Sequence, residues 1–260
     1  CMSDSSIVVV AGPSGSGKTA WIVQCLTEAT QPALYVSVDG EAISVELAYI
    51  GYRFPKVRLA NASGLPQVLK ALSEPTAVYV EVGFAEDVRA LDLGGLPCRR
   101  VAILPPSLHH SVWHDWADEI VLGNDVAIFE PDKMPEVWTM SLTGQVFDAP
   151  SLDEITIELT GGAYGKVHRM KALVELPDGR LFHLDFVDGM PGIEYGEPRV
   201  PQWLEGRPQR FSGIEVVGWN LEGDTIARTI GDGCLSTEAI AHYQLQYKSQ
   251  RSSSVPQAAL

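Results

Sequence analysis

The feature that most constrains this chain is a glycine-rich segment placed directly after an apolar run. Residues 8–19 read Val-Val-Val-Ala-Gly-Pro-Ser-Gly-Ser-Gly-Lys-Thr and contain the pattern G-x-x-x-x-G-K-T. An amphipathic stretch, residues 20–29, follows. This is a phosphate-binding loop in its required context of strand, loop and helix. The weaker interpretation is a glycine turn that merely joins a strand to a helix.

Each residue of the motif receives an expected role. The glycines allow a turn whose amide groups point at an anion, and the amino end of the helix adds its positive dipole. We expect Lys18 to reach the β- and γ-phosphates, as a catalytic and binding group, and Thr19 to ligate Mg²⁺. The remaining phosphate-binding residues are expected to be Gly12, Gly15, Ser16, Gly17 and Ala20. The sequence therefore predicts a site for GTP or ATP with Mg²⁺.

Three carboxylates are candidates for the metal side of this site. Glu81 stands at the end of an apolar run, where it could hold the water shell of Mg²⁺ or position an attacking water. A buried carboxylate without a partner would be costly, which favours a functional role for Glu81. Asp39 and Glu41 follow the second expected strand, where a switch segment could approach the metal. A turn capped by Asp is the alternative there.

Charge and cysteine content exclude several classes of function. The 19 Lys and Arg residues against 33 Asp and Glu residues give a net charge of -14, which argues against nucleic-acid partners and anionic membranes. The basic residues 166–171 alternate with apolar ones and are expected to be a solvated strand face. The 4 cysteines show no C-x-x-C spacing, and no apolar run approaches the ~20 residues of a membrane span. We expect a cytoplasmic protein.

The first part of the chain alternates apolar strands with helical stretches, which is typical of a parallel α/β sheet. We expect residues 1–150 to form a nucleotide-binding domain of this class, ending in a linker over residues 145–150. The expected helices are residues 20–29, 65–72 and 111–116. The expected strands are Ile7–Ala11, Ala33–Val38, Val57–Ala60, Ala77–Val82, Arg100–Leu104, Glu119–Leu122 and Val137–Met140.

The second part has a different period. Residues 151–247 are expected to form a smaller α+β domain, and residues 248–260, rich in Ser and Gln, a flexible tail. Pro177-Asp178-Gly179 predicts a hairpin turn. Helices are expected over residues 224–230 and 236–247, and strands at Ile155–Leu159, Lys166–Leu176, Arg180–Phe186 and Phe211–Gly218.

Motifs in both parts resemble the CobW-type GTP-binding metallochaperones. Besides the phosphate loop, the chain has Glu81-Val82-Gly83, similar to the family's E-x-x-G element. The second part has Gly165-Lys166-Val167-His168-Arg169-Met170-Lys171 and Arg207-Pro208-Gln209-Arg210-Phe211, similar to patterns of the CobW C-terminal domain, and ends near Cys234-Leu235. The resemblance implies a P-loop GTPase domain followed by a CobW C-terminal-like domain. It also implies GTP and Mg²⁺ as ligands and a chaperone or switch role toward a protein client.

The chain departs from the family at three functional elements. Its E-x-x-G element is one residue short, as Glu81-Val82-Gly83. Gly123-Asn124-Asp125 stands where the family has the base-reading N-K-x-D, so Asn124 and Asp125 are candidates for base contacts and guanine selectivity stays open. The family's metal motif C-x-C-C is missing, and clustered cysteines are needed for a soft thiolate site. A metal site of histidines is the remaining possibility for Zn²⁺. His110, His114 and Asp118 would share one face if residues 109–118 were helical, although surface packing is the stronger interpretation.

These observations leave three candidate functions. The first is a slow nucleotide-dependent hydrolase or switch that acts on a protein partner. The second is metal delivery with histidine and carboxylate ligands, and the third is a non-hydrolysing nucleotide-binding assembly factor.

Overall fold

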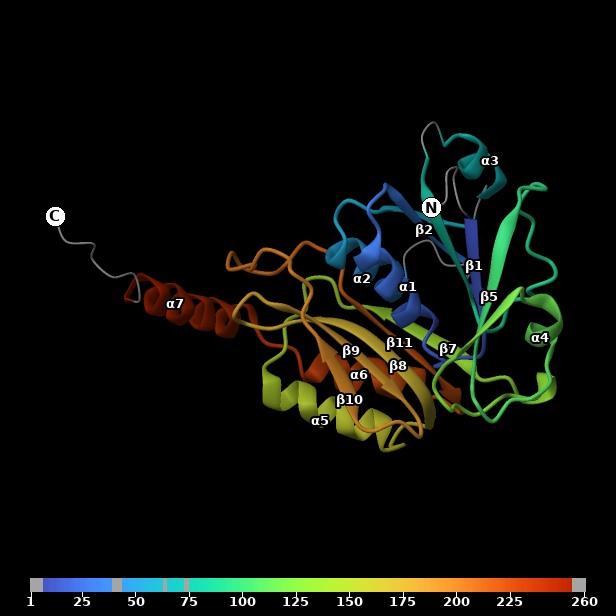
Figure 1. Ribbon diagram of the computed structural model, residues 1–260. Coiled ribbons are helices and arrows are strands. Elements are labelled where there is room, and N and C mark those ends of the chain that lie inside the picture. Colours follow the sequence, from blue (N-terminus) through green and yellow to red (C-terminus); the bar gives the residue numbers. More distant parts are fainter. Residues whose placement is uncertain (1–6, 39–43, 63–64, 73–74, 254–260) are drawn as a thin grey trace. The chain divides into compact units, whose positions relative to one another are not determined.

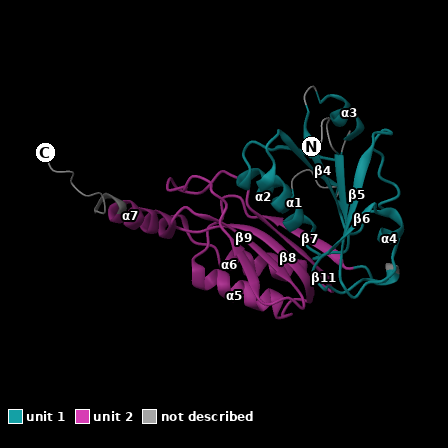
Figure 2. Ribbon diagram, in the orientation of Figure 1, with its two compact units in different colours: residues 1–134 teal, residues 135–260 magenta. Residues whose placement is uncertain are grey.

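The computed structural model describes residues 7–38, 44–62, 65–72 and 75–253. The chain divides into two compact units between Met134 and Pro135 (Figure 2). Residues 135–150, which the sequence assigned to the first domain, therefore belong to the second unit. The described residues of each unit contain one β-sheet with helices beside it (Figure 1).

The first unit is built on a six-stranded parallel sheet in the order β3-β2-β4-β1-β5-β6. This confirms the predicted α/β class with a phosphate loop after the first strand. The helices are α1 (Lys18–Glu28), α2 (Val45–Arg53), α3 (Leu65–Lys70) and α4 (Val112–Trp116), with a short 3₁₀ turn at Pro131–Lys133. The strands are β1 (Ile7–Ala11), β2 (Ala33–Val38), β3 (Arg58–Asn61), β4 (Ala77–Val82), β5 (Cys98–Leu104) and β6 (Glu119–Leu122).

Side-chain alternation in the central strands separates two faces of this sheet. Strands covered on both faces are apolar throughout, and all five residues of β1 are buried. Val9 and Val80 are register partners and belong to one apolar cluster. Val10 and Glu81 are partners in the same pair of strands, so Glu81 points to the opposite face. Burial raises the pKa of the Tyr79 hydroxyl, a register partner of Val8, and the Cys25 thiol of α1 adds to the rise. Because Thr19 of α1 also bonds to Glu81 at 2.9 Å, α1 covers the face that carries Glu81.

Helix α2 was not predicted from the sequence. Its signal is local: the Ser44 side chain accepts a hydrogen bond from the Leu47 amide at 3.0 Å and caps the helix. Val45, Tyr49 and Ile50, at helical spacing, are buried. The same first turn also buries an acidic residue, Glu46.

The second unit contains a five-stranded antiparallel sheet in the order β10-β9-β8-β11-β7. Side chains of α5 and α6 pack on one face of it, against Met170, Ala172 and Val216. The Pro177–Gly179 turn between β8 and β9 is confirmed by the Glu175–Leu181 register. The helices are α5 (Ala149–Thr160), α6 (Gly223–Asp232) and α7 (Thr237–Ser253), and the strands are β7 (Glu136–Ser141), β8 (Lys166–Glu175), β9 (Leu181–Val187), β10 (Ile193–Gly196) and β11 (Gly213–Trp219).

Three predicted elements at or just after the boundary are wrong. The strand expected at 137–140 does not close the parallel sheet: as β7 it pairs with β11 at the edge of the second sheet. Residues 145–150 are not a linker, because Asp148 caps α5 by accepting from the Ser151 amide at 3.0 Å, and Pro150 sits in the first turn, where its missing N–H is tolerated. Residues 155–159 alternate like a strand but are helical, with Ile157 67% exposed.

The prediction that residues 166–171 form a solvated strand face is also wrong. The basic residues 166–171 lie in β8, in the interior of the sheet, and only Lys166 is exposed; Arg169 and Lys171 are buried. Arg169 forms an ion pair with Glu215 of β11, which compensates its burial. Residues 248–253, expected to be a flexible tail, continue α7, and residues 254–260 lie outside the described residues.

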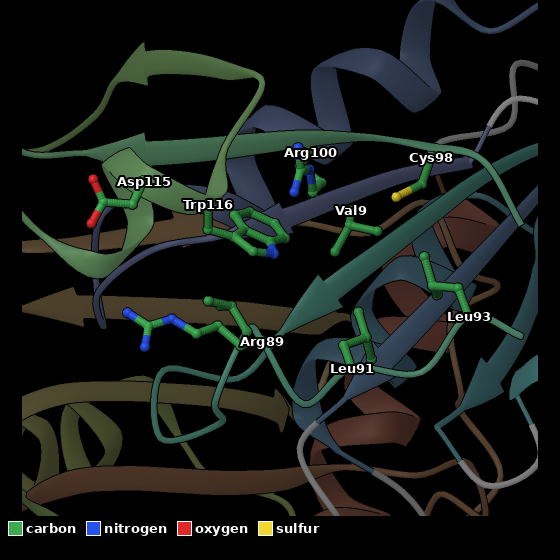
Figure 3. A pocket seen from close by; sticks show the side chains of 9 residues that line it. Val9, Arg89, Leu91, Leu93, Cys98, Arg100, Asp115 and Trp116 are labelled. Carbon is green, nitrogen blue, oxygen red and sulfur yellow. The ribbon is translucent and has the colours of Figure 1, made fainter. Parts of the chain in front are cut away.

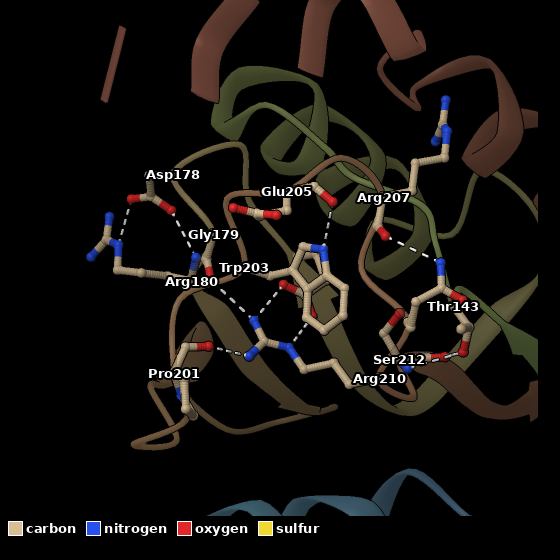
Figure 4. Close-up of polar contacts among 12 residues, drawn as sticks. Thr143, Asp178, Gly179, Arg180, Pro201, Trp203, Glu205, Arg207, Arg210 and Ser212 are labelled. Carbon is tan, nitrogen blue, oxygen red and sulfur yellow. Dashed lines mark hydrogen bonds and ion pairs between the residues drawn. The ribbon is translucent and has the colours of Figure 1, made fainter. Parts of the chain in front are cut away.

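A buried ion pair fastens the β8–β9 hairpin to the segment before β11 (Figure 4). The Arg210 guanidinium pairs with both carboxylate oxygens of Glu175 and donates to the carbonyls of Gly179 at 3.0 Å and Pro201 at 2.6 Å. The Glu175 side chain is fully buried. Burial raises the pKa of the Glu175 carboxyl, and Arg210 opposes that rise. One arginine thus joins three segments of the second unit.

We expect Arg210→Ala to lower the free energy of unfolding by about 3 kcal/mol, because a buried carboxylate would lose its partner. Without Arg210 the pKa of Glu175 rises further above its unfolded value. A group with a raised folded-state pKa stabilises the fold at low pH and loses that contribution as pH rises. The deficit of the variant should therefore be smallest in acid and grow toward neutral pH, as measured by urea unfolding.

Lys248→Ala is the matched control. Lys248 pairs with Glu205 in the same unit, and the two side chains are 48% and 88% exposed, so the loss should stay below about 1 kcal/mol. Equal losses for the two variants would contradict the role given to the Glu175–Arg210 pair.

Candidate functional site

The loop between β1 and α1 has the backbone that its glycines predict. Gly12, Gly15 and Gly17 have φ angles of 148°, 77° and 99°, which side-chain-bearing residues rarely adopt. A Cβ on Gly12 would lie 2.2 Å from the Ile103 carbonyl oxygen of β5. The neighbouring strand therefore fixes the start of the loop, and only glycine fits there.

Helix α1 directs its amino end toward this loop. The first amides of a helix lack partners within it, and the first bond back to the loop runs from the Trp21 amide to the Gly17 carbonyl at 3.0 Å. No acidic residue stands in the first turn of α1. The amino end of α1 thus presents free amide groups and a positive dipole, and its own first turn contains no acidic side chain that would neutralise them. An anion site requires these features.

The side chains of the loop are drawn inward. The Lys18 ammonium is buried and donates to the carbonyls of Gly12 and Pro13, both at 3.0 Å. The Ser16 hydroxyl is also buried and has no hydrogen-bond partner among the described residues. Ala20, the last predicted phosphate contact, is exposed in the first turn of α1.

Two carboxylates meet at the Thr19 hydroxyl. Thr19 Oγ1 lies 2.9 Å from Glu81 Oε1 and also within hydrogen-bond distance of Glu46 Oε1. The other oxygen of Glu81 accepts from the Tyr35 hydroxyl at 3.0 Å. Glu46 and Glu81 are both buried. Elements α1, α2, β2 and β4 each supply one member of this cluster.

The oxygen cluster has the chemistry of a magnesium site. Mg²⁺ is held in proteins by carboxylate and hydroxyl oxygens and keeps several waters. A hydroxyl has one hydrogen, so Thr19 can donate to only one of the two carboxylates at a time. A divalent cation beside Thr19 would offset the repulsion between Glu46 and Glu81. The residues present therefore fit the predicted metal.

The sequence interpretation missed Glu46 and Tyr35. The available signal for Glu46 was the Ser44 cap followed by apolar residues at helical spacing. Asp39 and Glu41, the other predicted metal residues, lie outside the described residues.

The segment after β6 packs against the phosphate loop. The side-chain amide of Asn124 donates to the Gly15 carbonyl at 2.9 Å, and the backbone amide of Asn124 donates to the Ser16 carbonyl at 3.0 Å. A Cβ on Gly123 would lie 2.2 Å from the Ser16 carbonyl oxygen. Asp125 is exposed, and its carboxylate accepts from Ser107. Asn124 thus contacts the loop itself.

The predicted histidine site does not form. Helix α4 begins at Val112, so His110 precedes it, and His114 Nδ1 is bonded to the Ser111 hydroxyl at 2.9 Å. Asp118 pairs with Arg100, whose guanidinium holds the pKa of that carboxyl at about 2. Across the described parts of the chain, no three His, Cys, Asp or Glu residues cluster as metal ligands.

No protein-family model matches this chain, and no curated protein does. Two solved structures are similar: the zinc-bound YjiA GTPase from E. coli, with a TM-score of 0.31, and a zinc-bound triple mutant of YjiA, with a TM-score of 0.32. Each is 9% identical to this chain, and each match covers 89% of this chain and 99% of the other. Among the described residues, no helix combines the length and apolar character needed to cross a bilayer.

We expect Gly123→Ala to lower the free energy of unfolding by roughly 1–3 kcal/mol, because backbone atoms must move to admit the new methyl group. Urea unfolding measures the change. Gly231→Ala in α6 is the control: nothing lies within 4 Å of its added Cβ, so it should be neutral or slightly stabilising. A Gly123→Ala protein as stable as the parent would show that Gly123 and the phosphate loop are not tightly packed.

Proposed function

We propose that this chain binds a nucleoside triphosphate with Mg²⁺ and hydrolyses it slowly. The main support for this proposal is that the phosphate-binding loop and the oxygen cluster lie next to each other, because two adjacent residues belong to them. Lys18 lies within the loop, and Thr19, the next residue, contacts Glu46 and Glu81. A triphosphate and its metal need these two environments side by side.

Each group at this site has its own task. Loop amides and Ser16 bind phosphate oxygens, and Lys18 neutralises the β- and γ-phosphates. Thr19, Glu46 and Glu81 hold the metal directly or through its waters, and Tyr35 fixes the orientation of Glu81. Bound Mg²⁺ would stabilise negative charge on the phosphates. Lys18 is the cation that we place at the reacting phosphate. NTPases that lack an additional arginine at this phosphate hydrolyse their nucleotide slowly, so we expect slow turnover.

Base preference is the less constrained part of the proposal. We assign Asn124 to holding the loop, because both of its bonds go to loop carbonyls. Asp125 is the remaining candidate for a base contact. Its carboxylate is exposed and bonded to Ser107, a hydroxyl that a base could displace. We propose GTP over ATP on the resemblance to CobW-type proteins.

A protein client belongs to the same proposal. The two carboxylates at Thr19 come from α2 and β4, so a bound cation would change the contacts of α2 in response to nucleotide. The resemblance of the second unit to a CobW C-terminal domain implies that this change is passed to a partner protein. The alternative is an assembly factor that binds nucleotide without hydrolysis, which would show bound nucleotide and no phosphate release.

We expect Lys18→Ala to weaken GTP binding roughly a hundredfold, or about 2.8 kcal/mol, because the loop would lose its buried ammonium. Calorimetric titrations of GTP, GDP, ATP and ADP, each with and without Mg²⁺, measure the affinities and the base preference. A parent protein without measurable affinity for any of the four would contradict the proposed function.

We expect Glu46→Gln and Glu81→Gln each to raise the Mg²⁺ concentration needed for half-maximal GTP binding roughly tenfold or more. Each substitution removes one negative charge beside Thr19 and keeps the side-chain size. Glu28→Gln is the control, because Glu28 is exposed at the end of α1. An unchanged Mg²⁺ requirement in both variants would remove the oxygen cluster from the metal site.

A further inference from the structure

The face of the parallel sheet opposite to α1 carries a cavity beside β5. Strands β4 and β5, which both pair with β1, are joined by residues 83–97, and this connection contains turns and bends but no helix. Connections between parallel strands are usually helical. Beneath the irregular connection a cavity of about 460 Å³ remains, within the range of roughly 300–1,000 Å³ for small-molecule sites.

The middle of this cavity is apolar. Val9 of β1 forms its floor, Leu91 and Leu93 of the connection form one wall, and the Trp116 indole of α4 faces them (Figure 3). Val9 and its neighbours belong to the apolar cluster on this face of the sheet. An aromatic or branched apolar group would therefore find apolar partners on several sides.

Charges of both signs stand at one end of the cavity. Arg89 and Asp115 lie at the same end in Figure 3, and Cys98 lies at the other. Arg89 and Asp115 are exposed, and within the described residues neither side chain has a hydrogen-bond or ion-pair partner. The third ion of the lining, Arg100, is already paired with Asp118 through bonds of 3.1 and 2.5 Å.

We propose that this cavity binds a small zwitterion with an apolar body, of the size of an aromatic amino acid or an apolar dipeptide. The ligand's carboxylate pairs with Arg89, its ammonium with Asp115, and its apolar group lies between Trp116 and Leu91. A ligand with a charge of one sign would satisfy one of these ions and face the other. The site uses the face of the sheet opposite to the one that carries Glu81.

Calorimetric titration of the full chain without nucleotide tests this proposal. The probes are L-phenylalanine and L-leucyl-L-phenylalanine, which distinguish the two ligand sizes. The matched controls are 3-phenylpropanoate, which lacks the ammonium group, and 2-phenylethylamine, which lacks the carboxylate. We expect at least one zwitterion to bind tenfold or more tightly than either control compound.

Two variants separate the charges. Arg89→Gln should weaken the preferred zwitterion fivefold or more and remove its advantage over 2-phenylethylamine. Asp115→Asn should do the same relative to 3-phenylpropanoate. Both side chains are exposed, so the fold should be kept. Arg228→Gln and Asp132→Asn remove equal charges at exposed positions elsewhere and should leave binding unchanged.

Cys98 provides a readout of location. A bound ligand should slow alkylation of Cys98 by iodoacetamide, mapped by mass spectrometry, and leave Cys25 unaffected because α1 covers the opposite face. Burial raises the pKa of the Cys98 thiol, so the reaction is run at mildly alkaline pH.

Three results would overturn the proposal: no binding of either zwitterion at millimolar concentration, binding of a control compound as tight as that of the zwitterions, or unchanged binding in Arg89→Gln and Asp115→Asn. The same titrations on Lys18→Ala should match the parent protein. Failure here therefore stays distinguishable from failure of nucleotide binding.

Discussion

The first unit depends on one constraint, the close packing of the phosphate loop. The loop contacts strand β5 on one side and the segment after β6 on the other. Gly12 approaches the Ile103 carbonyl and Gly123 approaches the Ser16 carbonyl so closely that neither tolerates a side chain. Asn124 then closes the arrangement with two hydrogen bonds to the loop. Backbone that would be strained in isolation is held by its surroundings, so neighbouring backbone fixes the conformation of the loop.

The same arrangement explains why the oxygen cluster at Thr19 forms where it does. Once the loop is fixed, α1 starts at Lys18, and Thr19 points to the sheet face that Glu81 shares. Helix α2 covers the same site with Glu46, so the cluster combines groups separated by 27 and 62 residues in sequence. The conformation of the loop thus determines where the start of α1 and the end of β4 meet.

Local patterns predicted much of this fold, and tertiary context decided the rest. β4 and β6 could be located to the residue because their apolar runs have clear ends, and Gly12 to Thr19 could be assigned because their spacing requires one conformation. The alternation at 155–159 was misleading, since Leu152, Ile155 and Leu159 also fit a helix and the Asp148 cap settles the choice. The sheet that β7 joins depends on pairing with β11, which no local signal reports. Glu46 could be placed at the site only once helix α2 was recognised, and the local signal for the start of that helix is the single capping residue Ser44.

The buried ion pair between Arg210 and Glu175 also has a consequence for unfolding kinetics. Glu175 stands 35 residues before Arg210, so the chain between them must lose its freedom before the pair can form. Interactions that are absent from the transition state govern how fast a native protein unfolds rather than how fast it folds. We infer that the Glu175–Arg210 pair belongs to this class and lengthens the lifetime of the folded second unit.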